Sequence, residues 1–259
     1  MSHVVIGKAT LYHGDCRELM RHLPDGSADL CMADPPYGDT SLEWDSIVRG
    51  WLPEVARVLK PSGSIWIFGS LRFMNGIFSD MEASGFKYSQ DIVWEKQNGT
   101  GLHNDRFRRV HEHAVLFYRG AWSDVYHETQ YTNDAVARAV RRKQKPQHWG
   151  GIGEASYVSE DGGPRMMRSV LQVRNEHGNA IHPTQKPIDL LRPMVRYSCP
   201  PGGAILDPFM GAASVGVAAL MEDREYAGFE LEEDYFKKCE NRLYEVIDPK
   251  QKEMFGVIA

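Results

Sequence analysis

Short apolar runs alternate with segments of helical periodicity at both ends of this chain. Each apolar run ends in a polar or glycine-containing turn, as a buried strand does. Strands that alternate with helices are typical of a parallel sheet covered by helices on both faces, so we predict an α/β fold. In the first third, the pattern predicts strands at Ala9–His13, Asp29–Met32 and Ser64–Gly69, and helices at Cys16–Met20, Asp45–Leu59 and Leu71–Met81.

The alternation returns in the last third of the chain. The pattern there predicts a helix that begins at Pro187, a strand at Ala204–Leu206, a helix at Val215–Met221, a strand at Glu225–Phe229 and a final helix at about Glu232–Val246. Before it, Phe86–Glu95 and Glu112–Tyr118 predict an antiparallel pair at the edge of the sheet. From about residue 120 to residue 180 the regular pattern fails. We therefore divide the chain into 1–119, 120–180 and 181–259.

The stretch Ala33-Asp34-Pro35-Pro36-Tyr37-Gly38 directly follows the strand predicted at Asp29–Met32. Proline cannot continue a sheet ladder, so Asp34 stands on a stiffened turn at the carboxyl end of a strand. Ligands bind at that edge in α/β sheets. Such pairs of residues are also ordinary turn punctuation, but a turn does not need Tyr37. That ring can stack on a planar group while Asp34 and the Pro35 carbonyl accept hydrogen bonds from an amine.

A second turn, Asp207-Pro208-Phe209-Met210-Gly211-Ala212-Ala213-Ser214, joins a predicted strand to a predicted helix. Its small residues allow a ligand to approach the backbone, and Glu230 ends the next strand, where it can accept both hydrogen bonds of a ribose diol. The turn lacks the GxGxxG pattern of dinucleotide sites. A cofactor that contains a nucleoside fits it better.

Five cations cluster in the irregular segment, among Tyr131, His148 and Trp149. A charge run is usually a solvated face. Because the net charge of the chain is −5, binding to nucleic acid needs a local basic patch, and we favour phosphate contacts for this cluster. Its members are Arg138, Arg141, Arg142, Lys143 and Lys145.

The cysteines and the ends of the sequence bear on the cellular setting. The four cysteines form no CxxC pair, which argues against zinc or a disulfide framework and favours a reducing compartment. His111-Glu112-His113 has no third ligand in sight, so we predict no metal. The start lacks a signal pattern and no run is long enough to span a membrane. We expect a cytoplasmic protein with no membrane partner.

Taken in order, the motifs resemble those of S-adenosylmethionine-dependent N6-adenine and N4-cytosine DNA methyltransferases of the β arrangement. The matching residues are Gly14-Asp15, Asp34–Tyr37, His182-Pro-Thr-Gln-Lys-Pro187, Asp207–Gly211 and Glu230. The resemblance covers most of the chain except about 120–180. It implies a Rossmann-like methyltransferase sheet with permuted motif order, in which 120–180 is an irregular target-recognition insertion. It also implies double-stranded DNA as substrate, and often a homodimer.

The resemblance also implies roles for single residues. Asp34, Pro35, Pro36 and Tyr37 are the expected catalytic residues, acting on a base flipped out of the duplex. The expected residues around S-adenosylmethionine are Asp15, Asp34, Thr184, Lys186, Asp207, Phe209, Gly211, Ser214 and Glu230. Asp15 has an alternative role as a helix N-cap. The chain departs from the family at Gly211-Ala212-Ala213, where Gly-Ser-Gly is common.

Asp at the first position of the catalytic motif resembles the adenine-modifying members, so we predict N6-adenine methylation. N4-cytosine methylation is the first alternative. Methylation of RNA or protein glutamine is a further one, although those enzymes usually have the opposite motif order. An inactive DNA-binding module is the last, and the intact Asp34, Tyr37 and Glu230 argue against it.

Overall fold

The chain divides into two compact units. The structure is a computed structural model that describes residues 3–38, 42, 45–100, 104–141, 156–176, 178 and 180–247. The larger unit comprises Met1–Glu128 and Ser169–Ala259, and the smaller one comprises Thr129–Arg168. None of the helices in the described part of the chain has the length and apolar character that crossing a bilayer requires.

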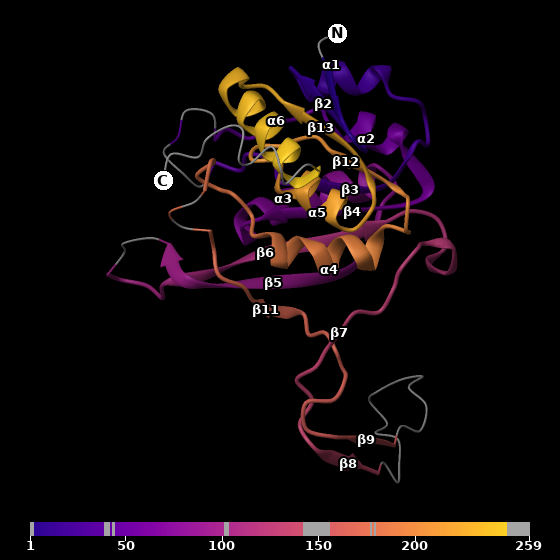
Figure 1. Ribbon diagram of the computed structural model, residues 1–259, viewed down its shortest axis with the longest axis vertical. Coiled ribbons are helices and arrows are strands. Elements are labelled where there is room, and N and C mark those ends of the chain that lie inside the picture. The colour runs from indigo at the N-terminus through magenta and orange to yellow at the C-terminus, as the bar shows by residue number, and fades with distance from the viewer. Residues whose placement is uncertain are drawn as a thin grey trace. The chain divides into compact units, whose positions relative to one another are not determined.

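A nine-stranded sheet forms the centre of the larger unit (Figure 1). Its order is β1 (His3–Ile6), β2 (Ala9–His13), β13 (Glu225–Glu230), β12 (Ala204–Asp207), β3 (Ala28–Ala33), β4 (Leu59–Gly69), β6 (Arg109–Tyr118), β5 (Lys87–Thr100) and β11 (Val170–Gln172). The strands β2, β13, β12, β3 and β4 run parallel, and β6 runs antiparallel to both β4 and β5. The carboxyl ends of the five parallel strands therefore lie at one edge of the sheet.

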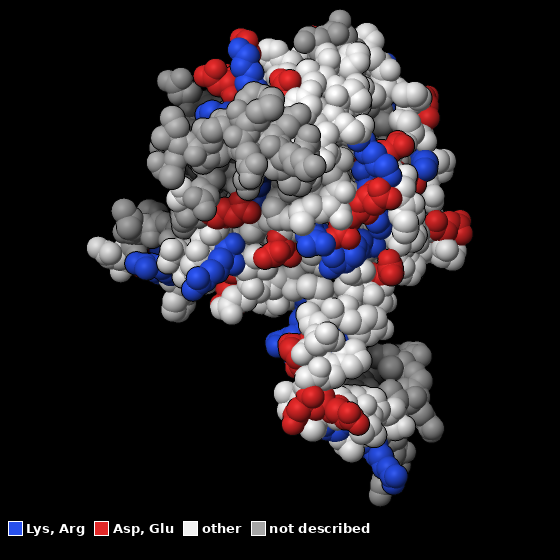
Figure 2. Space-filling model, in the orientation of Figure 1, with Lys and Arg blue, Asp and Glu red and all other residues white. Residues whose placement is uncertain are grey.

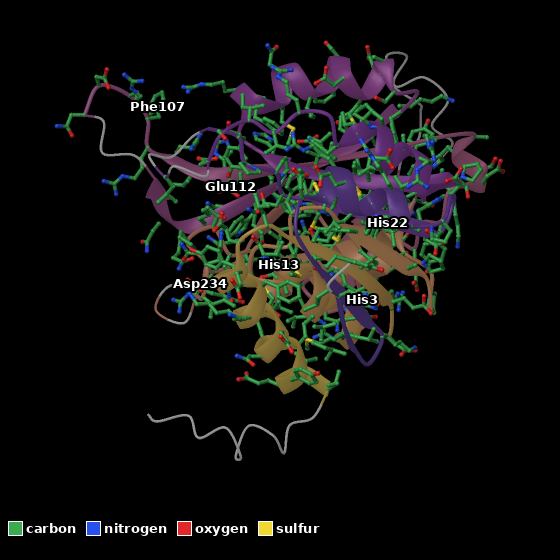
Figure 3. The ribbon with its side chains drawn as sticks, turned by 90° about the horizontal axis from the view of Figure 1, so that it is seen from above. His3, His13, His22, Phe107, Glu112 and Asp234 are labelled. Atoms are coloured by element: carbon green, nitrogen blue, oxygen red, sulfur yellow. The ribbon has the colours of Figure 1, made fainter. Side chains whose placement is uncertain are left out.

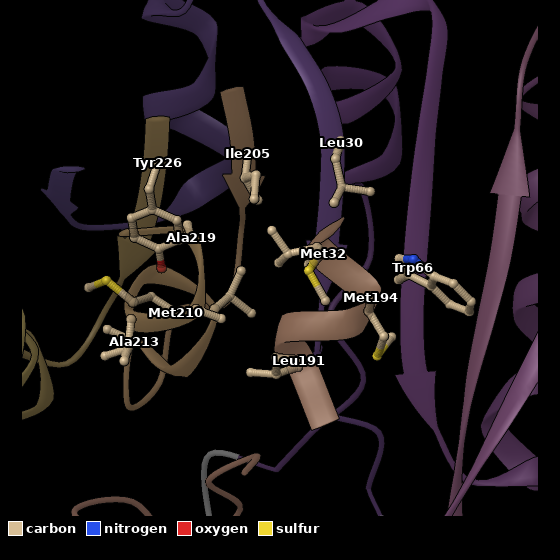
Figure 4. Close-up of a cluster of buried hydrophobic side chains, with 14 of the residues drawn as sticks. Leu30, Met32, Trp66, Leu191, Met194, Ile205, Met210, Ala213, Ala219 and Tyr226 are labelled. Atoms are coloured by element: carbon tan, nitrogen blue, oxygen red, sulfur yellow. The ribbon is translucent and has the colours of Figure 1, made fainter. Parts of the chain in front are cut away.

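Helices cover both faces of this sheet because its central strands are apolar on both sides. In β3, Leu30 and Met32 join one buried cluster, whereas Cys31 and Ala33 join the other. The first cluster includes side chains of α4 (Ile188–Ser198), α5 (Ser214–Met221) and α6 (Glu233–Ile247). Figure 4 shows part of this cluster, with Leu191 and Met194 of α4 beside Met32 of β3. The second includes side chains of α1 (Cys16–Leu19), α2 (Leu52–Val58), α3 (Leu71–Ala83) and the 3₁₀ turn η1 (Met20–His22). The predicted α/β class with helices on both faces is confirmed.

Two details of the prediction were wrong. The helix predicted at Asp45–Leu59 begins only at Leu52, and Leu59 already belongs to β4. The helix cannot extend back through Gly50, which has φ +83°, and Asp45 accepts hydrogen bonds from the backbone of the Asp34 turn. The β5 and β6 pair also does not end the sheet, because β11 adds to β5 in parallel.

The smaller unit contains two short antiparallel strand pairs. β7 (Tyr131–Thr132) pairs with β10 (Arg165–Met166), and β8 (Arg138–Val140) pairs with β9 (Tyr157–Ser159). This unit is narrower than the segment predicted from 120 to 180, since both β11 and the 3₁₀ turn η2 (Trp122–Asp124) belong to the larger unit. Of the predicted basic cluster, Arg138 and Arg141 are exposed. Arg142, Lys143 and Lys145 lie outside the described residues, as do His148 and Trp149.

Candidate functional site

Acidic residues from both halves of the sequence meet where the parallel strands end. Asp34 follows β3, Asp207 ends β12, Glu230 ends β13, and Asp15 follows β2. A pocket of about 330 Å³ is lined by Asp15, Asp34 and Glu230, together with Phe209 and Gly211. The strand order thus brings the two motifs that the sequence suggested for catalysis and for a nucleoside into one pocket.

Glu230 is held in this pocket by two backbone amides. Its Oε2 accepts a hydrogen bond from the Gly211 amide at 2.9 Å, and its Oε1 accepts one from the Glu232 amide at 2.9 Å. Burial raises the pKa of Glu230, and these hydrogen bonds offset part of the rise. Each carboxylate oxygen can accept a further hydrogen bond. The side chain is therefore a pre-oriented acceptor for a pair of hydroxyl groups.

The turn after β12 is stabilised by a carboxylate and by a left-handed residue. Asp207 is 2% exposed; it accepts hydrogen bonds from the Tyr226 hydroxyl at 2.9 Å and from the Phe209 amide at 3.2 Å. Burial raises the pKa of Asp207 to about 7. Ala213 has φ +53° and precedes α5, a conformation that favours glycine. The departure from the family's glycine at this position is therefore accommodated at the cost of backbone strain.

Ser214, the first residue of α5, is tied to the last helix. The Arg242 guanidinium donates hydrogen bonds to the Ser214 hydroxyl at 3.1 Å and to the Ala212 carbonyl at 2.7 Å. A smaller cavity of about 30 Å³ lies at this turn, and Asp34, Lys186 and Asp207 also line it. Arg242 was not identified from the sequence, where it is one of many helix cations.

Lys186 forms a buried ion pair with Asp34. Its Nζ lies 2.5 Å from Asp34 Oδ2, and the Lys186 side chain is only 5% exposed. Burial raises the pKa of Asp34, and the Lys186 ammonium counteracts part of that rise. The resemblance implied that Lys186 lies beside the cofactor, and in the structure its ammonium lies on the Asp34 carboxylate. Among the described residues no hydrogen bond reaches the other oxygen, Oδ1.

Glu112 continues this pair into a chain of alternating charges. Its Oε2 lies 3.5 Å from Lys186 Nζ and has no hydrogen-bond partner in the described part of the chain, while its Oε1 forms a close ion pair with Lys96. Burial raises the pKa of Glu112, but the two ammonium groups outweigh it and hold the pKa at about 2. The order of charges is Asp34, Lys186, Glu112 and Lys96.

In the sequence, Glu112 stands out only as part of the His111-Glu112-His113 motif considered for a metal. The described residues contain no group of three or more His, Cys, Asp or Glu side chains placed to hold a metal ion. The sequence signal that points to Glu112 is an acid beside the apolar run Ala114–Phe117, on a strand whose neighbours are buried. An acid at such a position needs a cationic partner.

Asp45 and Phe73 contact the turn that follows Asp34. Asp45 is 9% exposed, and its Oδ1 accepts hydrogen bonds from the Tyr37 amide at 3.0 Å and the Gly38 amide at 2.9 Å. The Tyr37 ring lies 5.8 Å from the Phe73 ring, tilted by 40°. Pro35 is buried and Pro36 lines the larger pocket. Neither Asp45 nor Phe73 was identified from the sequence.

Asp15 and Thr184 line different cavities of the site. Asp15 caps α1 by accepting a hydrogen bond from the Arg17 amide at 2.8 Å, and it also lines the larger pocket. Hydrogen bonds from the Arg17 side chain lower the pKa of Asp15. The capping role is therefore present, and it leaves the carboxylate at the pocket wall. Thr184 lines the smaller cavity, with its hydroxyl 3.1 Å from His182 Nδ1.

Comparison with known proteins places this site in a family. The N6/N4 DNA methylase family model matches residues 28–241. The Type II methyltransferase M.HinfI of Haemophilus influenzae is 29% identical over an alignment of 265 residues, gaps included. The alignment covers 92% of this chain and 68% of that protein. The Type II methyltransferase M2.DpnII of Streptococcus pneumoniae is 28% identical over 260 residues, which cover 91% of this chain and 90% of that protein.

Solved structures share the fold. The M1.HpyAVI complex with SAM aligns with a TM-score of 0.63 at 24% identity, covering 90% of this chain and 99% of the other. The cytosine-N4-specific PvuII DNA methyltransferase aligns with a TM-score of 0.62 at 17% identity, covering 92% and 90%. The match of the family model extends from β3 into α6 and so includes both motifs of the pocket. This chain therefore belongs to the N6/N4 DNA methylase family.

Proposed function

We propose that this protein transfers a methyl group from S-adenosylmethionine to the N6 amino group of adenine, in a base flipped out of double-stranded DNA. The observation that carries the proposal is that Asp34 lines the same pocket as Glu230, whose carboxylate is oriented by the Gly211 amide. Such a reaction requires that one pocket holds both a hydrogen-bond acceptor for the target amine and an acceptor for the nucleoside of the cofactor.

The residues present fit this cofactor. A pocket of about 330 Å³ is within the usual range for a small-molecule site. Glu230 would accept the two ribose hydroxyls, and Phe209, held edge-on by Trp51 at 5.3 Å, offers an apolar surface for the adenine ring. Asp15 lies at the same wall. When bound, S-adenosylmethionine supplies a methyl group on a sulfonium.

Asp34 would act on the target amine. The lone pair of an exocyclic amino group is delocalised into its ring, which makes the amine a poor nucleophile. Asp34 Oδ1 and the Pro35 carbonyl would each accept one N–H, favouring a pyramidal nitrogen with its lone pair directed outwards. Lys186 occupies Oδ2 and so orients the carboxylate. The raised pKa of Asp34 makes it a better acceptor for the proton that the amine loses.

The choice of adenine rests on the Asp34 motif, since a cytosine-N4-specific enzyme has a similar fold. The test is to incubate the purified protein with methyl-labelled S-adenosylmethionine and duplex genomic DNA, and to identify the methylated nucleoside by mass spectrometry. We expect N6-methyladenine. N4-methylcytosine as the only product would contradict the choice of base, and label found only in RNA or protein would contradict the proposal altogether.

Asp34→Asn tests the assigned role. We expect a 100-fold or greater fall in kcat, roughly the effect of removing one preorganised charge or hydrogen bond at a reacting group. The affinity for S-adenosylmethionine, measured by calorimetry, should change little, because the ribose acceptor is untouched. Asp25→Asn is the matched control, since its side chain is 79% exposed. A fully active Asp34→Asn would refute the mechanism.

For the smaller unit, we propose that Thr129–Arg168 recognises the DNA target. Support comes from the exposed cations Arg138 and Arg141 and from Tyr131 and Tyr157, which are 61% and 49% exposed. So small a unit offers limited surface for gripping a duplex, and we propose that two copies of the chain act together. A monomer in sedimentation runs with and without DNA would contradict the dimer.

A further inference from the structure

The hairpin of β5 and β6 extends from the edge of the sheet that carries the site. β6 runs antiparallel to both β4 and β5, so the turn between β5 and β6 lies at the edge where β4 and its parallel neighbours end. The last paired residues of the two strands are Thr100 and Arg109. We call the described part of their connection, Asn104–Arg108, the hairpin tip. Figure 3 shows Phe107 at this tip, standing away from the sheet.

The hairpin tip combines an aromatic side chain with cations. Phe107 is fully exposed (102%), the highest value among the large exposed hydrophobic residues of the described chain. Arg106 and Arg108 flank it on the exposed surface, and Arg106 forms an ion pair with the neighbouring Asp105 at 2.8 Å. Lys and Arg side chains gather along this projecting end in Figure 2. A protein that is acidic overall thus presents a basic tip with an apolar centre.

The base of the hairpin is anchored to the catalytic residues. Lys96 of β5 pairs with Glu112 of β6, and Glu112 in turn faces Lys186, which holds Asp34. Phe107 lies five positions from Glu112, at most about 17 Å along an extended chain. Successive nucleotides of one strand are about 3.4 Å apart. The span from Glu112 to Phe107 is therefore at most about five nucleotide steps, which places the tip near the base steps around a nucleotide whose base enters the Asp34 pocket.

We propose that the hairpin tip contacts the DNA duplex at the target, with Phe107 inserted into the base stack beside the flipped nucleotide and Arg108 on a phosphate. Flipping a base costs stacking energy, and an apolar wedge that fills the vacated step compensates part of that cost. An exposed phenyl ring between cations suits DNA as the partner, because the ring can enter a base step while the cations contact the phosphates around it. This proposal rests on the proposed function and adds the residues of the hairpin tip to those that take part in it.

Phe107→Ala tests the wedge by comparing duplex with heat-denatured genomic DNA as substrates. Because denatured DNA has no intact stack to fill, we expect kcat/KM on duplex to fall about 10-fold or more, the scale of one lost stacking contact, with little change on denatured DNA. Phe107→Trp, which keeps an aromatic ring at this position, should retain the activity on duplex DNA that Phe107→Ala loses. Val5→Ala, which truncates a 60% exposed residue of β1, is the matched control. Unfolding midpoints should agree among all variants, since Phe107 is exposed.

Arg108→Gln tests the phosphate contact. The slope of the logarithm of DNA affinity against the logarithm of salt concentration should decrease by about 0.9, as for one lost phosphate contact.

Equal losses on duplex and denatured DNA, or no loss in Phe107→Ala, would overturn the wedge. A change in sedimentation of Phe107→Ala without DNA would show that the tip contacts a second copy of the chain, and would also overturn it. Failure of the proposed function is distinguishable, since the unmodified protein would then methylate neither form of DNA.

Discussion

The buried charge of Glu112 should stabilise the fold measurably, and Glu112→Gln removes that charge while keeping the shape of the side chain. Glu112 is 14% exposed and lies between Lys186 and Lys96. Its pKa falls from an ordinary 4.5 to about 2, which corresponds to roughly 3 kcal/mol at about 1.4 kcal/mol per pH unit. Breaking a buried pair by removing one partner costs about 3–5 kcal/mol in general. Both routes predict that the free energy of unfolding at pH 7 falls by about 3 kcal/mol.

The sign of the pH dependence follows from the direction of the shift. The pKa of Glu112 is lower in the folded protein than in the unfolded chain, so its contribution is fully present above about pH 4.5 and is lost as the pH falls towards 2. The difference between the unmodified protein and Glu112→Gln, measured by urea unfolding, should therefore shrink over that range.

Glu225→Gln is the control for this experiment, because Glu225 is also a strand glutamate but is exposed. We expect the free energy of unfolding of this variant to stay within about 0.5 kcal/mol of the unmodified protein. If Glu112→Gln is as stable as Glu225→Gln at pH 7, the charge chain does not stabilise the fold and the reasoning is wrong.

Two further variants probe the cofactor half of the site. Glu230→Ala should weaken S-adenosylmethionine binding by about 1.5–3 kcal/mol, the scale of a hydrogen bond to a charged group. The control Glu233→Ala, at the exposed start of α6, should leave binding unchanged. Equal affinities of the two variants in calorimetry would contradict the assignment of Glu230 to the ribose. Asp207→Asn should stabilise the protein at pH 8 by up to about 4 kcal/mol, since burial raises the pKa of Asp207 from 3.8 to about 7. Because the pKa is raised, the stability contributed by protonated Asp207 is present below about pH 4 and is lost as the pH rises to 7. The gain measured by urea unfolding should therefore vanish at about pH 4. A gain that does not depend on pH would contradict the assignment.

The sequence by itself determined the elements whose signals are local. Alternation in β3 sends Leu30 and Met32 to one face and Cys31 and Ala33 to the other, which period-two geometry requires of any buried strand. The helix predicted at Leu71–Met81 is found as α3 (Leu71–Ala83), with Ser70 as its N-cap. The order of the two motifs likewise needed no coordinates, and the family match agrees with it.

Tertiary structure alone decided which charges meet. Asp34 and Lys186 are 152 residues apart in the chain, and the sequence motif of Lys186 suggested contact with the cofactor rather than with the Asp34 carboxylate. Glu112 reaches both lysines because β6 adds to β4 in antiparallel direction, a choice that no local pattern encodes. The helical pattern likewise did not reveal the late start of α2, where Gly50 has φ +83° and Asp45 accepts hydrogen bonds from the backbone of the Asp34 turn. Pairing across the sheet depends on strand order, and strand order is decided by the packing of the whole core.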